Sequence, residues 1–212
     1  MKNNINIAVV GLGQVGIYLL NELNTKKKEI ELKTGKKINV VAISAKNINK
    51  KRRFKVNKKI FYKNPLEIFN KTKVDILFEA IGLSDGISKK IVETALKKKI
   101  HVVTPNKALI SKHGDYLAKL AEDNEVNLEF EASVAGGIPI LRTIKEGLAT
   151  NKISKVYGIL NGTSNYILSE MESSNDSFSN VLKKAQKFGY AEPGNPKLDL
   201  NGFDAFAKVR IL

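Results

Sequence analysis

The chain has 212 residues, of which 42% are hydrophobic and 27% are charged, so it can bury the core of one or two globular domains. No apolar run approaches the roughly 20 residues that span a bilayer, and the first residues lack the apolar core and cleavage site of a signal peptide. The sequence has no cysteine, which excludes disulfides, thiolate metal sites and cysteine nucleophiles, and its two histidines argue against a histidine-based metal site. We therefore expect a cytoplasmic protein without a membrane partner.

The net charge of +15 is concentrated in one region of the chain. Between Asn24 and Asn64 there are 15 lysines and arginines but only two acidic residues, whereas the rest of the chain is nearly balanced. A basic region of this kind can bind nucleic acid. However, lysines outnumber arginines by 32 to 4, and specific nucleic-acid sites tend to use arginines and stacked aromatic side chains. Nucleic acid is therefore not the expected partner.

The first part of the chain alternates apolar strands with amphipathic helices, which indicates a parallel sheet with crossover helices. We expect strands over residues 5–10, 38–43, 74–78, 101–104 and 127–131. Helices are expected from a glycine-rich turn to about residue 24, over 86–99, from Pro105 onward and over 116–124, with polar or basic loops over 25–37 and 44–59. The expected fold class is α/β, with a doubly wound Rossmann-type nucleotide-binding domain over residues 1–128.

The pattern changes after about residue 128, where we expect a second domain of the α+β class. Its expected elements are a helix over 138–150, a strand over 153–160, helices over 164–173 and 178–188, and a last amphipathic helix over 203–212. The chain ends on the apolar residues VRIL, although a domain boundary normally falls in exposed polar sequence. We therefore expect residues 129–212 to be the N-terminal part of an incomplete second domain.

The sequence GLGQVG follows the first expected strand and opens the first helix, which is the setting of a dinucleotide-binding loop. Gly11 permits a tight turn, Gly13 lets the backbone approach a pyrophosphate, and Gly16 lets helix and strand pack closely. The helix start at Gln14 and Val15 would supply N–H donors to the anion. A plain glycine-rich turn is the alternative, but the context favours a bound dinucleotide at these positions.

The segment from Ser44 to Lys59 contains no acidic residue. A site that prefers NAD usually places an aspartate or glutamate after the second strand, where it holds the ribose 2′-hydroxyl. Ser44, Lys46, Arg52 and Arg53 would instead suit a 2′-phosphate, because charge-assisted hydrogen bonds favour phosphate over hydroxyl. We expect NADP as the preferred cofactor and NAD as the second choice, with a solvated basic loop as the alternative.

Four longer motifs follow one another along the chain. They are TPNK at Thr104–Lys107, FEASVAGGIPIL at Phe130–Leu141, GILNGTSNYIL at Gly158–Leu168 and AEP…DLNGFDAFAKVRIL at Ala191–Leu212. In sequence and order these motifs resemble those of homoserine dehydrogenases, although Gly194-Asn195-Pro196 stands where that family usually has Asp-Pro. The resemblance implies NAD(P)H-dependent interconversion of L-aspartate 4-semialdehyde and L-homoserine in threonine, methionine and isoleucine biosynthesis, by a homodimer. The family's catalytic region is longer, which agrees with an incomplete second domain.

The last motif carries the residues to which the resemblance assigns the chemistry. Lys208 corresponds to the proton donor, Asp204 to an acid near the substrate, and Glu192 to a residue that holds the substrate's ammonium group. A lysine can protonate the alkoxide that forms as hydride arrives. Asp204 and Lys208 are at positions i and i+4, so they share one face of the expected helix. Without the resemblance, such a pair is most often a surface salt bridge.

Three residues are expected at the nicotinamide end of the cofactor. By resemblance, Lys107 faces both the nicotinamide and the substrate, and an exposed lysine at a helix start is the alternative. Gly82 and Ser84 follow an expected strand, where the cleft of an open α/β sheet lies. We therefore expect them to line the nicotinamide pocket.

The resemblance also implies a monovalent cation, usually sodium, held by backbone carbonyls. The ligands carried over are the carbonyl oxygens of Glu131, Val134, Gly136 and Ile138. Hard cations take oxygen ligands, and glycine-rich backbone can aim several carbonyls at one point. A tight turn without an ion is the alternative.

The segment Asn161-Gly162-Thr163 fits the N-glycosylation sequon, but the chain shows no signal peptide that would expose it to glycosylation. We expect its small polar residues to cap the following helix and to line the substrate cleft.

Two other functions remain as alternatives. A phosphorylating semialdehyde dehydrogenase needs a cysteine nucleophile, which this chain lacks. A non-catalytic NADP-binding or nucleic-acid-binding protein could use the basic region 24–64, but it would not need the set of Glu192, Asp204 and Lys208.

Overall fold

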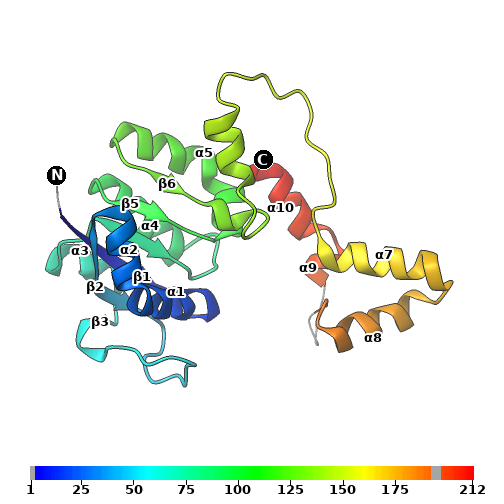
Figure 1. Ribbon diagram of the computed structural model, residues 1–212, viewed down its shortest axis with the longest axis horizontal. Coiled ribbons are helices and arrows are strands. Elements are labelled where there is room, and N and C mark those ends of the chain that lie inside the picture. The colour runs from blue at the N-terminus through cyan, green and yellow to red at the C-terminus, as the bar shows by residue number, and fades with distance from the viewer. Residues whose placement is uncertain (1–2, 192–196) are drawn as a thin grey trace. The chain divides into compact units, whose positions relative to one another are not determined.

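The computed structural model describes residues 3–191 and 197–212. The chain divides into two compact units, Met1–Gly137 and Ile138–Leu212, so the division lies later than the expected boundary after residue 128 (Figure 1). In the described part of the chain, no helix has both the length and the apolar character required to cross a membrane.

The first unit is built on a six-stranded sheet with the strand order β3-β2-β1-β4-β5-β6. Every neighbouring pair of strands is parallel. The strands are β1 (Asn4–Val10), β2 (Lys37–Ser44), β3 (Phe61–Tyr62), β4 (Ile76–Glu79), β5 (His101–Val103) and β6 (Leu128–Glu129). This is the order of a doubly wound nucleotide-binding fold, so the predicted fold class is confirmed.

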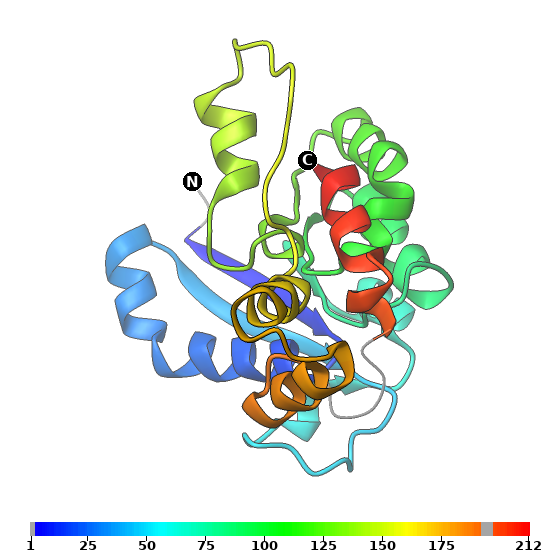
Figure 2. The ribbon, with the colours of Figure 1, turned by 90° about the vertical axis from the view of Figure 1, so that its right-hand side faces the viewer.

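Helices cover both faces of this sheet. Its helices are α1 (Gln14–Thr25), α2 (Lys27–Thr34), α3 (Ile68–Lys71), α4 (Ile87–Lys97) and α5 (Lys107–Asp123), with short 3₁₀ helices at Lys58–Ile60, Pro65–Glu67 and Glu131–Ser133. Right-handed crossovers place α1 and α2 on one face, and α4 and α5 on the other (Figure 1 and Figure 2). The carboxyl ends of all the strands therefore meet at one edge, where ligands bind in open α/β sheets.

The core under α1 is made of strand residues that are apolar on both sides of the sheet. Ile7, Val9 and Ile43 are buried there together with Leu12 of the glycine-rich loop. Partly buried leucines of α1 pack against this cluster, at positions 19, 20 and 23. The burial of the central strands explains why they read as nearly continuous apolar runs in the sequence.

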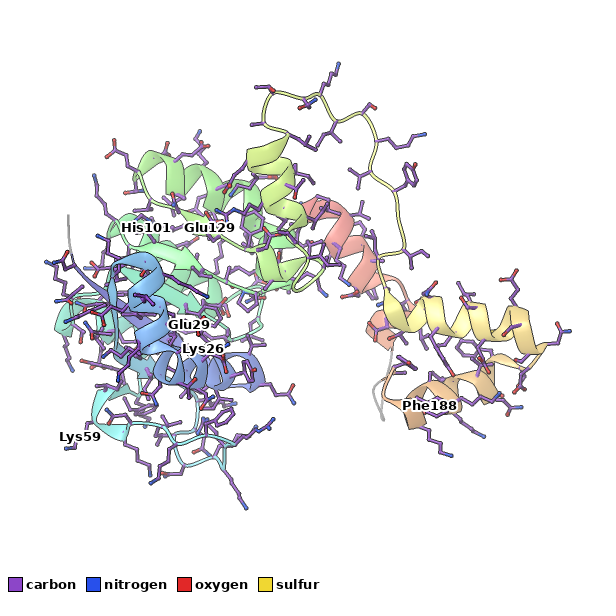
Figure 3. All side chains as sticks on the ribbon, viewed as in Figure 1. Lys26, Glu29, Lys59, His101, Glu129 and Phe188 are labelled. Atoms are coloured by element: carbon purple, nitrogen blue, oxygen red, sulfur yellow. The ribbon has the colours of Figure 1, made fainter. Side chains whose placement is uncertain are left out.

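The loop predicted over residues 25–37 is wrong, because most of it forms helix α2. Within this helix the Lys33 ammonium lies 2.6 Å from the Glu29 carboxylate, four positions earlier, and Lys37, just after the helix, lies 3.6 Å from Glu31. Gly35 then ends the helix in the left-handed conformation. Figure 3 labels Lys26 and Glu29 on this part of the chain. Such charge pairs stabilise a helix that has almost no apolar face, so hydrophobic periodicity does not reveal it.

Two smaller expectations also need correction. The short strand β3 was not predicted, because only Phe61 and Tyr62 belong to it. Helix α5 begins at Lys107 rather than at Pro105, because the Asn106 side chain caps it by accepting a hydrogen bond from the Leu109 N–H. Helix α5 then continues without a break to Asp123.

In its described part, the second unit consists of helices and loops. The helices are α6 (Ile140–Arg142), which continues into a π-helical turn (Thr143–Gly147), α7 (Gly162–Ser174), α8 (Phe178–Phe188), α9 (Lys197–Leu200) and α10 (Phe203–Ile211). Helices α7 and α8 lie side by side (Figure 1 and Figure 2). Ile167, Val181, Ala185 and Ala191 are buried between and beside them. Phe188, labelled in Figure 3, is 64% exposed at the end of α8.

The strand predicted over residues 153–160 is not formed. The segment has no regular secondary structure, and Tyr157 and Ile159 are 88% and 77% exposed. A strand needs a partner to accept its hydrogen bonds, and no residue described in this unit belongs to a strand. The apolar alternation that suggested a strand is therefore present in the sequence without the pairing that would form one.

We predict that Gly11 cannot be replaced without loss of stability. Gly11 has φ +93°, and a Cβ there would collide with the carbonyl group of Ala80, so Gly11→Ala is expected to lower the free energy of unfolding by about 1–3 kcal/mol. Gly13→Ala is the matched control, since a Cβ there would meet no heavy atom within 4 Å. Thermal melting followed by circular dichroism measures both variants. Equal melting temperatures would contradict the account.

Candidate active site

The glycine loop, Gly11–Gly16, leaves the start of helix α1 accessible. The Gly11 N–H donates to the Ser44 carbonyl at 2.9 Å, which ties the loop to the end of β2. Gly16 is buried so closely against the Gly11 carbonyl that no side chain would fit there. Gly13 precedes the helix in an extended conformation, and no described side chain caps the helix start. Gly13, Gln14 and Val15 are exposed, so an anion can reach the first N–H groups of α1.

Arg52 joins the glycine loop to the basic loop, which is the acid-free segment Ser44–Lys59, by hydrogen bonds. Its guanidinium Nε donates to the Leu12 carbonyl at 3.1 Å. Its terminal nitrogens donate to the carbonyls of Asn47, Ile48 and Lys50 at 2.6–3.0 Å. Most of the N–H groups of Arg52, which was expected to help hold a 2′-phosphate, are therefore used within the protein.

The other candidate phosphate ligands differ in accessibility. Ser44 is 2% exposed. Lys46 and Arg53 are exposed, and the Arg53 guanidinium lies 5.5 Å from the centroid of the Phe54 ring. Lys59, further along the same loop, is exposed as well (Figure 3). The exposed charges of Lys46 and Arg53 are thus the ones that remain available to a ligand.

A buried glutamate, which the sequence analysis missed, joins the loops at the carboxyl edge of the sheet. Glu79 ends β4, and its carboxylate accepts the Thr104 hydroxyl at 2.7 Å and the Ile81 N–H at 2.8 Å. The Asn106 amide lies 3.3 Å from both carboxylate oxygens. The only signal in the sequence is one acidic residue at the end of an apolar strand, VDILFE.

Gly82 and Ser84 lie on the loop that follows β4. Gly82 has φ +87° and is exposed. The Ser84 hydroxyl donates to the Asp85 carboxylate at 2.6 Å. Hydrogen bonds from the Lys112 ammonium, the Ser84 hydroxyl and the His113 ring hold the pKa of Asp85 well below its ordinary value. Asp85 is therefore charged at neutral pH, and it fixes the orientation of the Ser84 hydroxyl.

A cavity of about 700 Å³ lies beside the glycine loop, within the first unit. Its wall includes Gln14 and Val15 of the glycine loop and Thr104 and Pro105 of the TPNK motif. Glu131 of the FEASVAGGIPIL motif also lies in this wall. Three motifs that are far apart in the sequence therefore meet around one hollow. Lys107, the last residue of TPNK, is the first residue of α5 and is half-buried.

The expected cation ligands lie on a tightly turned segment. Ala135 and Gly136 have φ values of 57° and 57°, so two consecutive residues adopt the left-handed conformation. The Glu131 carbonyl accepts the Val134 N–H at 3.2 Å. Ile138 is the first residue of the second unit, and its carbonyl accepts the Ile140 N–H at 2.8 Å.

The second unit brings Asp204 and Lys208 together on helix α10. The Lys208 ammonium lies 2.7 Å from the Asp204 carboxylate, and the two side chains are only 21% and 14% exposed. The same ammonium donates to the Leu160 carbonyl at 2.7 Å. An ordinary surface salt bridge is more exposed and lacks such a third partner, so this geometry argues against a plain surface salt bridge between Asp204 and Lys208.

Asn161 connects this pair to the start of α7. Its side-chain oxygen accepts the Ser164 N–H at 2.8 Å, so the predicted cap is confirmed. Its amide nitrogen donates to Asp199 at 2.9 Å and to Asp204 at 3.1 Å. The Thr163 hydroxyl donates to the Tyr190 carbonyl at 2.5 Å and lies 3.4 Å from Asp199.

Asp199 was missed by the sequence analysis, although it lies within the quoted motif DLNGFDAFAK. The structure brings it together with Asn161, Thr163 and Asp204, whereas Gly162 is exposed as the first residue of α7. Glu192 and Gly194-Asn195-Pro196 lie outside the described residues.

Comparison with known proteins gives a consistent result for both units. Residues 11–131 match the family model described as homoserine dehydrogenase, NAD binding domain, and residues 139–212 match the model described as homoserine dehydrogenase. The homoserine dehydrogenase of Neisseria gonorrhoeae is 40% identical over 208 residues, which are 98% of this chain and 47% of that protein. The Bacillus subtilis homoserine dehydrogenase is 36% identical over 98% of this chain and 48% of that protein.

Solved structures agree with the sequence comparison. A crystal structure of S. aureus homoserine dehydrogenase at pH 8.5 superposes with a TM-score of 0.85 at 37% identity, covering 100% of this chain and 49% of that one. The chain spans about half the length of the curated relatives it matches. The resemblance predicted from the four motifs is thereby confirmed, and the chain belongs to the homoserine dehydrogenase family.

Proposed function

We propose that the protein containing this chain interconverts L-aspartate 4-semialdehyde and L-homoserine. In the reducing direction, the aldehyde carbon takes a hydride from NADPH, the carbonyl oxygen takes a proton, and NADP⁺ leaves. The observation that carries the proposal is the half-buried Asp204–Lys208 pair, with its 2.7 Å contact and its ties to Leu160 and Asn161. Family membership of both units supports it.

The first unit is proposed to hold the cofactor. The open start of α1, where Gly13 leaves free space, fits a pyrophosphate, and Lys46 and Arg53 fit a 2′-phosphate. The bound nicotinamide supplies the hydride. Gly82, Ser84 and Lys107 are assigned to the nicotinamide end, since the loop that follows β4 and the first residue of α5, the helix after β5, carry them.

The second unit is proposed to supply the proton and part of the substrate site. The Lys208 ammonium has three protons, of which the Asp204 carboxylate and the Leu160 carbonyl engage two. The third can be donated to the alkoxide oxygen that develops on the substrate. Asp204 keeps the ammonium oriented, and Asn161 holds Asp204.

The substrate's ammonium group needs carboxylate partners. Glu192 is proposed for this role on the basis of the motif. Asp199 and Thr163 lie beside Asn161 and Asp204, and together with Gly162 they are proposed to complete the substrate site. Asn161 joins the Asp199 carboxylate to the Asp204–Lys208 pair, so this cluster holds two carboxylates and one lysine, which favours a cationic substrate group.

A monovalent cation, most simply sodium, is proposed on the carbonyl oxygens of Glu131, Val134, Gly136 and Ile138. The left-handed pair at Ala135 and Gly136 fits this role, because it turns the backbone sharply between the proposed ligands. Hard cations take oxygen ligands, so backbone carbonyls are suitable donors for sodium.

The remaining expectations stay predictions. We propose a homodimer, a cytoplasmic location and a place in threonine and methionine biosynthesis, on the strength of family membership. The alternative of a non-catalytic NADP-binding or nucleic-acid-binding protein finds no support, since both units match models of one enzyme family.

Replacing Lys208 by alanine should lower kcat by about 10²–10⁴-fold, because that is the usual contribution of general acid catalysis. NADPH affinity should stay nearly unchanged, since the cofactor is assigned to the first unit. Arg210→Ala is the matched control, because Arg210 is an exposed cation on the same helix. Steady-state kinetics and NADPH titration on the intact protein measure both. Near-normal kcat in Lys208→Ala would make Lys107 the next candidate for the donor.

Replacing Lys46 by glutamate should lower the ratio of kcat/KM with NADPH to kcat/KM with NADH by about tenfold, as expected for the loss of one charge-assisted hydrogen bond to phosphate. Lys51→Glu is the control, because it makes the same charge change at another exposed position of the loop. An equal effect in both variants would show that the cofactor preference depends on the overall positive charge of the loop and not on a contact from Lys46. A higher kcat/KM with NADH in the unmodified protein would refute the NADP preference itself.

Sodium dependence tests the proposed cation. Activity should fall several-fold when tetramethylammonium chloride replaces sodium chloride at constant ionic strength, because this large cation cannot enter a ring of carbonyls. Added sodium should restore activity along a saturable curve. Identical rates in the two salts would exclude a functional sodium site.

A further inference from the structure

The carboxylate of Glu79 is completely buried at the carboxyl end of β4, and the mechanism proposed above does not use it. Its exposed fraction is 0%, and among the side chains described in residues 3–191 and 199–212 no other acidic or basic one is buried. Burial of a charge is costly unless hydrogen bonds replace the lost water. The contacts of Glu79 therefore deserve a functional explanation.

The groups around the carboxylate are hydrogen-bond donors. One oxygen accepts the Ile81 N–H at 2.8 Å, and the other accepts the Thr104 hydroxyl at 2.7 Å. The Asn106 amide lies 3.3 Å from each oxygen. A set made only of donors matches an ionised carboxylate. The three partners belong to three segments: Ile81 to the loop after β4, Thr104 to the position just after β5, and Asn106 to the cap of α5.

Asn106 carries the connection further in two directions. Its amide nitrogen donates to the Leu83 carbonyl at 2.9 Å, so the loop after β4 is held on both sides of Gly82. Its side-chain oxygen accepts the Leu109 N–H at 3.2 Å, which fixes the start of α5 at Lys107. Glu79 thus fixes, directly or through Asn106, the backbone of the loop after β4 and of the start of α5, the two segments that carry the residues assigned to the nicotinamide end.

We propose that Glu79 is a positioning residue for the nicotinamide half of the cofactor site. The inference rests on the proposed function, which assigns Gly82, Ser84 and Lys107 to that half. Glu79 does not touch the cofactor; it acts through Ile81, Thr104 and Asn106. None of these hydrogen bonds reaches the glycine loop or the basic loop, which are assigned to the adenosine half.

Three substitutions separate this role from general stability. Glu79→Gln keeps the shape but puts an NH₂ donor where the surrounding groups are donors. Thr104→Val removes the hydroxyl at nearly constant volume, whereas Thr104→Ser keeps it. Glu122→Gln is the control, because Glu122 is exposed on α5 and makes the same chemical change away from the network.

The test measures Kd for NADPH and for adenosine 2′,5′-bisphosphate on the intact protein, by titration without substrate. Glu79→Gln and Thr104→Val should raise Kd for NADPH about tenfold, as expected for a lost hydrogen bond to a buried charge, and should change Kd for the bisphosphate less than about twofold. Thr104→Ser and Glu122→Gln should bind both ligands normally. In turnover, the first two variants should lose kcat more than they raise KM for the aldehyde.

Equal weakening of both ligands would overturn the proposal, because it would indicate a general structural effect. Unchanged NADPH binding in both Glu79→Gln and Thr104→Val would overturn it as well. If Glu79→Gln does not fold, the comparison of Thr104→Val with Thr104→Ser still decides between the outcomes. Because these titrations need no turnover, a protein that shows the expected split but does not reduce aspartate semialdehyde would refute the proposed function and leave the inference standing.

Discussion

Close packing among the loops at the carboxyl edge of the sheet is the constraint on which the first unit depends. Gly11 turns at φ +93° with so little room that any side chain would strike the Ala80 carbonyl. The residue before Ala80 is Glu79, and its buried carboxylate joins the loop after β4 to Thr104 and Asn106 by hydrogen bonds. The loop after β4 therefore has two separate sets of contacts: its Ala80 packs against the glycine loop, and Glu79 and Asn106 join it by hydrogen bonds to the start of α5.

The two units present different kinds of chemistry. At its glycine loop the first unit offers backbone N–H groups at an uncapped helix start, which suit phosphate groups whatever they are attached to. The second unit offers side chains: Lys208 is shared between Asp204 and Leu160, and Asn161 braces Asp204. The proposed cofactor binding thus relies on backbone geometry that few residue types permit, whereas the proposed proton transfer relies on one cation held by two acceptors.

The sequence was sufficient for features that arise from local pattern. The central strands, helix α8 and the cap at Asn161 were predicted because apolar runs, helical periodicity and capping residues act over a few positions. Features that depend on distant partners were not predictable. Glu79 is one acid in a strand until Thr104, 25 residues later, is placed beside it. The segment 153–160 has the pattern of a strand, but pattern alone does not provide a partner. Helix α2 was missed because its stabilising contacts are charge pairs.

The central claim is that a protein carrying these two units passes hydride from a nicotinamide to an aldehyde carbon and a proton to the aldehyde oxygen. The most direct test incubates the intact protein with L-aspartate 4-semialdehyde and NADPH dideuterated at C4, and analyses the product by mass spectrometry and NMR. The account predicts L-homoserine with a single deuterium on its C4 carbon, formed in step with NADP⁺. Consumption of NADPH without labelled homoserine, or no consumption at all, would contradict it.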